Sequence, residues 1–134
     1  MKVLVDTHIA LWAITNNKQL TEKAKVILLD PENDIYISAV SAWEVDMKTK
    51  SKKNNLTLST KRFAELCVQS GYIQLPLKIE HIYGANELVW EGEGAEHSDP
   101  WDRILLTQAM VEGMSFMTHD EMIPKFKQDC VISV

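Results

Sequence analysis

Short apolar runs along the chain alternate with longer segments in which apolar residues recur at helical spacing. The short runs are rich in Val, Ile, Phe and Tyr, and they lie at residues 2–5, 35–37, 72–75, 115–118 and 131–134. Parallel strands that are covered on both faces read as continuous apolar runs of this length. The pattern therefore predicts five buried strands.

The segments between these runs carry helix signals. Helices are predicted over 7–14, from the N-cap Thr21 to Asp30-Pro31, from Ser41 onward, over 60–69 before Gly71, from Ile79 toward Val89, and from Asp99-Pro100 to Glu112. Strands that alternate with helices imply right-handed crossovers and a mostly parallel sheet. We therefore predict an α/β fold, a three-layer α/β/α sandwich. A chain of 134 residues has room for one core, so we expect residues 1–134 to form a single domain.

Composition narrows the functional classes. Hydrophobic residues make up 46% and charged residues 25% of the chain, which excludes intrinsic disorder. The 14 Lys and Arg against 19 Asp and Glu give a net charge of −5, which argues against a surface that is basic all round and binds nucleic acid. A local basic patch or a bound cation stays open. Two cysteines, no secretory signal and no apolar run of about 18 residues favour a cytoplasmic protein without a membrane span.

Four carboxylates occupy positions where α/β proteins bind ligands. Asp6 directly follows the first predicted strand and Asp120 closely follows the fourth, while Glu44 and Asp102 fall in the first turns of predicted helices. Ligands bind beyond the carboxyl ends of the strands in such sheets. Gathered carboxylates repel one another, and a hard divalent cation such as Mg²⁺ or Mn²⁺ relieves that repulsion. Such an ion activates water and stabilises charge on a phosphoryl group.

Each acid also has a structural interpretation, and spacing alone leaves both open. Asp6 is placed to cap the helix that follows it, and Asp120 to stabilise a turn. Ser41 and Glu44 have the spacing of a capping box, and Asp99 precedes Pro100 as an N-cap does.

Positive and negative charges are segregated along the sequence. Residues 47–62 hold six positive residues and no acid, whereas residues 80–102 hold seven acids and neither Lys nor Arg. The six are Lys48, Lys50, Lys52, Lys53, Lys61 and Arg62. The division suits an enzyme that attracts phosphate on one side and metal on the other, although a solvated helix end explains the basic run equally well.

Five segments together resemble a known family. They are Val3–His8, Leu11-Trp12, Ser38–Glu44, His97–Arg103 and Thr118–Asp120. In this order they resemble the PIN-domain ribonucleases, and in particular the VapC-type toxins of bacterial toxin–antitoxin pairs. The segment His97–Arg103 is the most specific of the five, and the resemblance extends over nearly the whole chain.

The resemblance implies a metal-dependent endoribonuclease. Asp6, Glu44, Asp102 and Asp120 fall on the family's acidic positions, where they hold Mg²⁺ or Mn²⁺ for water to attack a phosphodiester, leaving a 5′-phosphate and a 3′-hydroxyl. Four further residues have expected roles beside them. Asp99 is a fifth acid, Thr118 and Thr7 would orient metal-bound water, and Arg103 would contact phosphate or form a structural ion pair.

The implied partners are an RNA substrate, a cognate antitoxin and a second copy of the chain. Trp12, Trp43 and the segment 48–53 are candidates for the antitoxin groove. One alternative is a catalytically silent PIN-like module that binds RNA or protein, but the four acids are all present. Another is a receiver-type signalling domain, which requires adjacent acids after the first strand, whereas Asp6 stands alone there.

Overall fold

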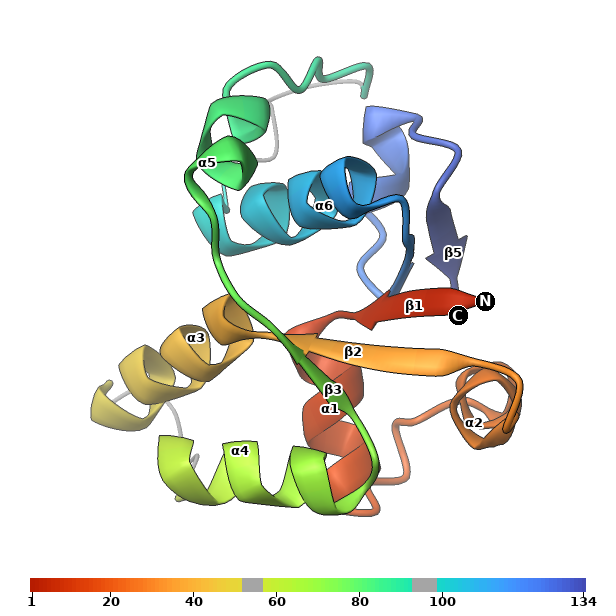
Figure 1. Cartoon of the computed structure of the whole chain (residues 1–134), viewed down its shortest axis with the longest axis vertical. Coiled ribbons are helices and arrows are strands. Elements are labelled where there is room, and N and C mark those ends of the chain that lie inside the picture. Colours follow the sequence, from red (N-terminus) through yellow and green to blue (C-terminus); the bar gives the residue numbers. More distant parts are fainter. Residues whose placement is uncertain (52–56, 93–98) are drawn as a thin grey trace.

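The structure, a computed structural model, describes residues 1–51, 57–92 and 99–134 (Figure 1). Its centre is a five-stranded sheet with the order β3-β2-β1-β4-β5. The strands are β1 (Lys2–Val5), β2 (Asp34–Ser38), β3 (Ile73–Leu75), β4 (Ser115–Thr118) and β5 (Val131–Ser133). All four neighbouring pairs are parallel, so the expected mostly parallel sheet is parallel throughout.

Helices cover both faces of this sheet. They are α1 (Thr7–Ile14), α2 (Glu22–Leu29), α3 (Ala39–Lys50), α4 (Thr60–Gln69), α5 (Ile79–Ala85), α6 (Pro100–Glu112) and the 3₁₀ helix η1 (Ile123–Phe126). In Figure 1, α1 and α4 lie on one side of the strands, and α5 and α6 lie on the other. The predicted α/β/α arrangement is therefore confirmed.

The apolar residues of the central strands β1 and β4 alternate between two cores. Val3 and Val5 of β1 pack with α1, α2 and α4, whereas Leu4 packs with α6 and η1. In β4, Met117 joins the first core and Phe116 the second. Because β1 and β4 are buried on both faces, their buried residues form nearly continuous apolar runs.

The start of α3 differs from the prediction. The helix begins at Ala39, and the hydroxyl of Ser38 caps it by accepting a hydrogen bond from the Val40 backbone N–H at 2.9 Å. Ser41 lies inside the helix, so the predicted capping box of Ser41 and Glu44 is wrong. Two serines three residues apart both have a suitable hydroxyl, and the one that ends β2 takes the cap.

Other predicted boundaries shift by a few residues. The third strand begins at Ile73 instead of Tyr72, and α5 ends at Ala85 instead of extending toward Val89. The predicted loop over residues 91–98 lies outside the described residues from 93 onward. The same holds for 52–56 of the basic run, including Lys52 and Lys53, and for His97 and Ser98 of the most specific segment.

Both cysteines are free thiols, and burial raises the pKa of Cys67 to about 12. None of the helices within the described ranges has the length and apolar character that crossing a membrane requires.

Candidate active site

Asp6 lies at the carboxyl edge of the sheet, between β1 and α1. Its backbone N–H continues the sheet by donating to the Met117 carbonyl of β4. One carboxylate oxygen, Oδ1, caps α1 by accepting from the His8 backbone N–H at 3.3 Å. The other, Oδ2, accepts from the Thr118 hydroxyl at 2.6 Å. Asp6 therefore does cap a helix, yet the same carboxylate is also fixed by a side chain from β4.

Burial dominates the electrostatics of Asp6. Only 3% of the residue is exposed, and removal from water raises the pKa of its carboxyl above the usual range. The hydrogen bond from Thr118 and the nearby His8 lower this pKa in part, while negative charge on Glu44 raises it further. Asp6 and Glu44, hereafter the carboxylate pair, are thus close enough to repel each other inside the protein.

Glu44 extends from the first half of α3 and is also buried, with 3% exposed. Its Oε2 accepts from the Lys48 ammonium at 2.6 Å, one helical turn further along α3. Its Oε1 is buried and has no hydrogen-bond partner among the described residues. A buried acceptor without a partner is costly, so it usually marks a place where an absent ion, water or ligand binds.

Asp102 and Asp99 lie at the start of α6. Asp99 is its N-cap, with Oδ1 accepting from the backbone N–H groups of Trp101 at 2.9 Å and Asp102 at 3.4 Å, and Pro100 follows at the first helical position. Asp102 is buried in the first turn, where the helix dipole favours a negative charge. The capping role predicted for Asp99 is confirmed.

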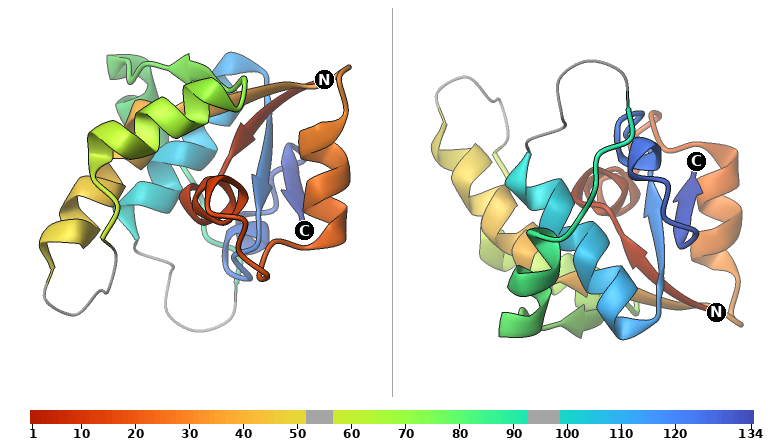
Figure 2. Two further views of the ribbon diagram at one scale, coloured as in Figure 1. Left: turned by 90° about the horizontal axis from the view of Figure 1, so that it is seen from below. Right: turned by 90° about the horizontal axis from the view of Figure 1, so that it is seen from above.

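The first turn of α6 also approaches α3. The rings of Trp43 and Trp101 meet edge to face with centroids 4.4 Å apart. Both views in Figure 2 place the start of α6 beside α3. Asp102 and Glu44 therefore come from helices that touch, each one residue beyond a tryptophan of this contact.

Asp120 is half-buried and follows β4. Its Oδ1 accepts from the backbone N–H groups of Met122 at 2.6 Å and Ile123 at 3.3 Å, so it organises the turn into η1. Its own N–H donates to the Thr118 hydroxyl at 3.0 Å, and that hydroxyl donates in turn to Asp6. Asp120 thus connects to the carboxylate pair through Thr118.

The other two predicted residues make structural contacts. The Thr7 hydroxyl is buried and donates to the Ser41 hydroxyl at 2.8 Å, which links α1 to α3. The Arg103 guanidinium donates to the carbonyls of Ala85 at 3.0 Å and Leu88 at 3.4 Å. It also lies over the Phe126 ring, 5.5 Å from its centroid, and so joins α6 to the end of α5 and to η1.

Comparison with known proteins decides the family. The family model described as the PIN domain matches residues 3–128. The chain belongs to the PIN domain family. A solved structure, VapBC2 from Rickettsia felis bound to a DNA fragment from their promoter, has a similar fold with a TM-score of 0.63 and 18% identity, over 100% of this chain and 98% of that one. No curated protein gave a sequence match. The predicted resemblance to PIN domains is therefore confirmed, and the shared fold extends over the full chain.

PIN domains generally use divalent metals, so the site must be tested against such an ion. Within 1–51, 57–92 and 99–134, no three Asp, Glu, His or Cys side chains converge as a ready-made metal site. The structure instead brings Asp6 and Glu44 together, with Lys48 against one oxygen of Glu44. Two buried carboxylates with an unpartnered oxygen form a donor set that suits Mg²⁺ or Mn²⁺. The residues present fit a hard cation on this evidence.

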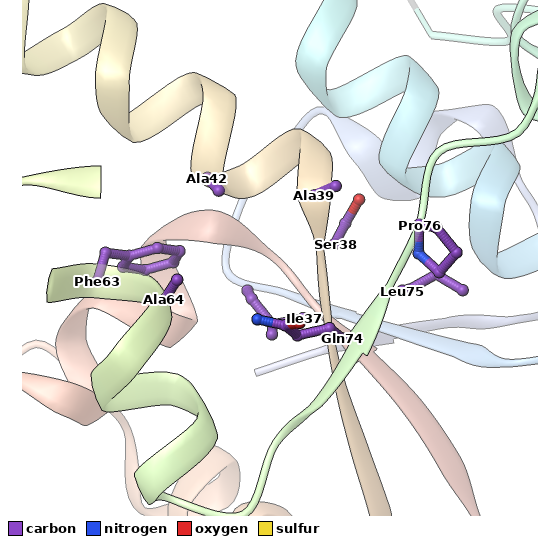
Figure 3. A pocket seen from close by; sticks show the side chains of 9 residues that line it. All are labelled: Ile37, Ser38, Ala39, Ala42, Phe63, Ala64, Gln74, Leu75 and Pro76. Atoms are coloured by element: carbon purple, nitrogen blue, oxygen red, sulfur yellow. The ribbon is translucent and has the colours of Figure 1, made fainter. Parts of the chain in front are cut away.

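Lys48 also belongs to this site, although from the sequence it was predicted only as part of the basic run over residues 47–62. The signal was present as the i,i+4 spacing of Glu44 and Lys48, which allows an ion pair on one helix face. A separate cavity of about 410 Å³ lies between α3, α4 and the end of β3 (Figure 3). Its walls, which include Ala42, Phe63 and Pro76, contain none of the predicted site residues.

Proposed function

We propose that this PIN domain is a metal-dependent endoribonuclease and the toxin of a toxin–antitoxin pair. The observation that carries the proposal is the carboxylate pair: beside the buried Asp6, Glu44 keeps a buried oxygen without a partner in the part of the chain that the structure describes. A protein maintains such an arrangement at a cost in stability, which points to a ligand with positive charge.

Asp6, Glu44, Asp102 and Asp120 would hold Mg²⁺ or Mn²⁺ in this proposal. When bound, the ion supplies an activated water and neutralises charge on the phosphodiester that is attacked. The chain's own residues do the positioning. Thr118 fixes the Asp6 carboxylate by donating to it, and the N-terminal turn of α6 directs positive backbone charge toward Asp102.

Thr7 and Arg103 have weaker claims to direct roles. The Thr7 hydroxyl holds α1 against α3, and Arg103 holds the segment after α5 against α6. We assign both of them to supporting the positions of the acids instead of to metal-bound water or phosphate.

The partners follow from the same proposal. The solved relative is described as VapBC2, bound to a DNA fragment from their promoter, and this supports a cognate antitoxin for the present chain. We further propose a homodimer in the cytoplasm. Trp43, of which 51% is exposed, remains a candidate for the antitoxin groove, and the exposed Met47 one turn further along α3 is added to it here.

The deciding experiment is an RNA cleavage assay with the purified chain. Cleavage is expected with Mg²⁺ or Mn²⁺, and it should be lost with EDTA and in Asp102→Asn. Activity that survives both treatments would contradict the metal–carboxylate mechanism. For the toxin role, expression without an antitoxin should arrest growth, and Glu44→Gln should restore it. Normal growth in the presence of soluble, RNA-cleaving protein would rule out the toxin role while leaving the nuclease intact.

A further inference from the structure

Two ion pairs with the same spacing lie on α3, and their environments differ sharply. Glu44–Lys48 and Asp46–Lys50 are both i,i+4 pairs, with N–O distances of 2.6 and 2.7 Å. The Glu44 side chain is 4% exposed and that of Lys48 30%, whereas the Asp46 and Lys50 side chains are 39% and 71% exposed. Only the first pair places an ammonium against a carboxylate that is removed from water.

The ammonium of Lys48 lies against Glu44, one member of the carboxylate pair. Its Nζ lies 2.6 Å from Glu44 Oε2 and 3.5 Å from Nε2 of the exposed His8, which follows Asp6 by two residues on α1. The positive charge of Lys48 therefore lies directly against the buried carboxylate of Glu44. Lys48 reaches only one oxygen of Glu44, since Oε1 has no partner among the described residues.

The side chain that fills this position is able to leave it. Lysine is a compact charge on a flexible stem, and 30% of this side chain is already exposed, so its ammonium can move outward into solvent when the ion pair with Glu44 breaks. A divalent cation would supply twice the charge and would reach oxygens that a single ammonium does not satisfy.

We propose that Lys48 is an internal counter-ion that competes with the divalent metal for Glu44 and is displaced when the metal binds. The inference rests on the proposed function, because it takes the carboxylate pair as the metal site. Lys48 then stabilises the metal-free protein and weakens metal binding, so that the occupied site forms only when the metal concentration is high enough to displace it.

The test is a calorimetric titration with Mn²⁺ of the wild-type chain, Lys48→Met and the matched control Lys50→Met. We expect Lys48→Met to bind Mn²⁺ about tenfold more tightly, because the competing charge is gone. Lys50→Met should bind as the wild type does. The thermal midpoint without metal should be lower in Lys48→Met than in the wild type, and saturating Mn²⁺ should raise it by more.

Two additional measurements distinguish a failure of this proposal from a failure of the proposed function. Lys48→Gln, which is also neutral but polar, should tighten binding as Lys48→Met does, and it serves if the Met variant does not fold. Cleavage of RNA by the wild type is recorded in parallel. If the wild type binds Mn²⁺ and cleaves RNA while neither Lys48 variant binds more tightly, the competition is refuted and the proposed function stands. If no variant binds Mn²⁺ and the wild type cleaves no RNA, both proposals fail.

Discussion

Two buried polar clusters in this molecule differ in how completely their hydrogen bonds are satisfied. The carboxylate pair, Asp6 and Glu44, combines two acids with an oxygen that has no partner within residues 1–51, 57–92 and 99–134. The second cluster, hereafter the α5–α6 network, consists of His81, Gln108 and Glu112. The His81 ring is fully buried, its Nδ1 accepts from the Lys78 backbone N–H at 3.0 Å, and its Nε2 lies 2.8 Å from Glu112 Oε1.

The α5–α6 network pairs donors with acceptors throughout. Since Nδ1 of His81 accepts, its Nε2 carries the proton and donates to Glu112. Gln108 accepts from the Ser38 hydroxyl through Oε1, and its Nε2 donates to the Pro76 carbonyl at 3.3 Å. A buried histidine beside a glutamate could have been taken for a catalytic dyad. Its complete pairing indicates a structural role, whereas the incomplete pairing of Glu44 indicates a binding role.

Asp6→Asn should produce the largest effect, because it should lower activity and raise stability at the same time. RNA cleavage should fall by about 10²-fold or more, because a metal ligand is removed. At neutral pH the metal-free variant should nevertheless melt at a higher temperature than the wild type, since it no longer buries a charged carboxylate. Its amide can still interact with Thr118 and the His8 N–H. Thermal melts in EDTA measure this, and a lower midpoint would show that Asp6 stabilises the fold as a charge.

Removing His81 should lower the stability of the fold and leave the cleavage reaction unchanged, the reverse of what is expected for Asp6→Asn. We expect His81→Ala to lose about 2–4 kcal/mol of unfolding free energy, since it leaves a cavity in the core and removes the acceptor of the Lys78 N–H. Mn²⁺ affinity and the turnover of the folded fraction should not change. Urea denaturation gives the loss. Glu112→Gln is the milder control, since an amide oxygen still accepts from Nε2. If a His81 variant folded normally but no longer cleaved RNA, the α5–α6 network would have a role in catalysis and not only in stability.

A substitution at the contact between α5 and α6 should destabilise the fold by less, and a second substitution should cancel that loss. A Cβ on Gly84 would lie 2.4 Å from Thr107 Cγ2, so Gly84→Ala should cost about 1–3 kcal/mol through overpacking. In a Thr107→Ser background that methyl group is absent, and the same substitution should be close to neutral. A double-mutant cycle in urea measures the coupling. Equal costs in both backgrounds would show that the Thr107 methyl group is not the source of the cost.

Local signals predicted much of the fold. The helices α1, α4 and α6 have the predicted bounds because each has a clear signal at one or both ends, such as Asp99-Pro100 at the start of α6 and Gly113 in the left-handed region at its end. The start of α3 was missed because two serines compete for one cap, and the strand register that selects Ser38 is a tertiary effect.

The positions of Asp6 and Glu44 could be predicted from the sequence, but the balance of charge around them could not. Asp6 and Glu44 follow from their places after strands, since parallel strands bring those places to one edge. The α5–α6 network joins His81 to Gln108 and Glu112, which follow it by 27 and 31 positions, and no local sequence pattern predicts such contacts. Whether a buried acid is satisfied depends on contacts of this kind, so the sequence alone left the capping and metal-binding interpretations of each acid open.

The two clusters should also respond to pH with opposite signs. The pKa of Asp6 is raised in the folded protein, chiefly by burial, so the folded state keeps a proton that the unfolded chain has lost. Its contribution to stability therefore falls as pH rises from the ordinary value of 3.8 through the raised one. The pKa of Glu112 is lowered, first by the hydrogen bond from His81, so its contribution is present above the ordinary value of 4.5 and disappears as pH falls through the lowered one.

The difference in unfolding free energy between the wild type and each variant isolates the contribution of one carboxyl group. Urea denaturation in EDTA at several pH values between about 3 and 7 gives the unfolding free energy of the wild type, Asp6→Asn and Glu112→Gln. The wild type minus Asp6→Asn should decrease with rising pH, and the wild type minus Glu112→Gln should increase. If both differences in unfolding free energy changed with pH in the same direction, the two clusters would not differ in this way. The charge of Asp6 would then be as well compensated, without any metal, as that of Glu112.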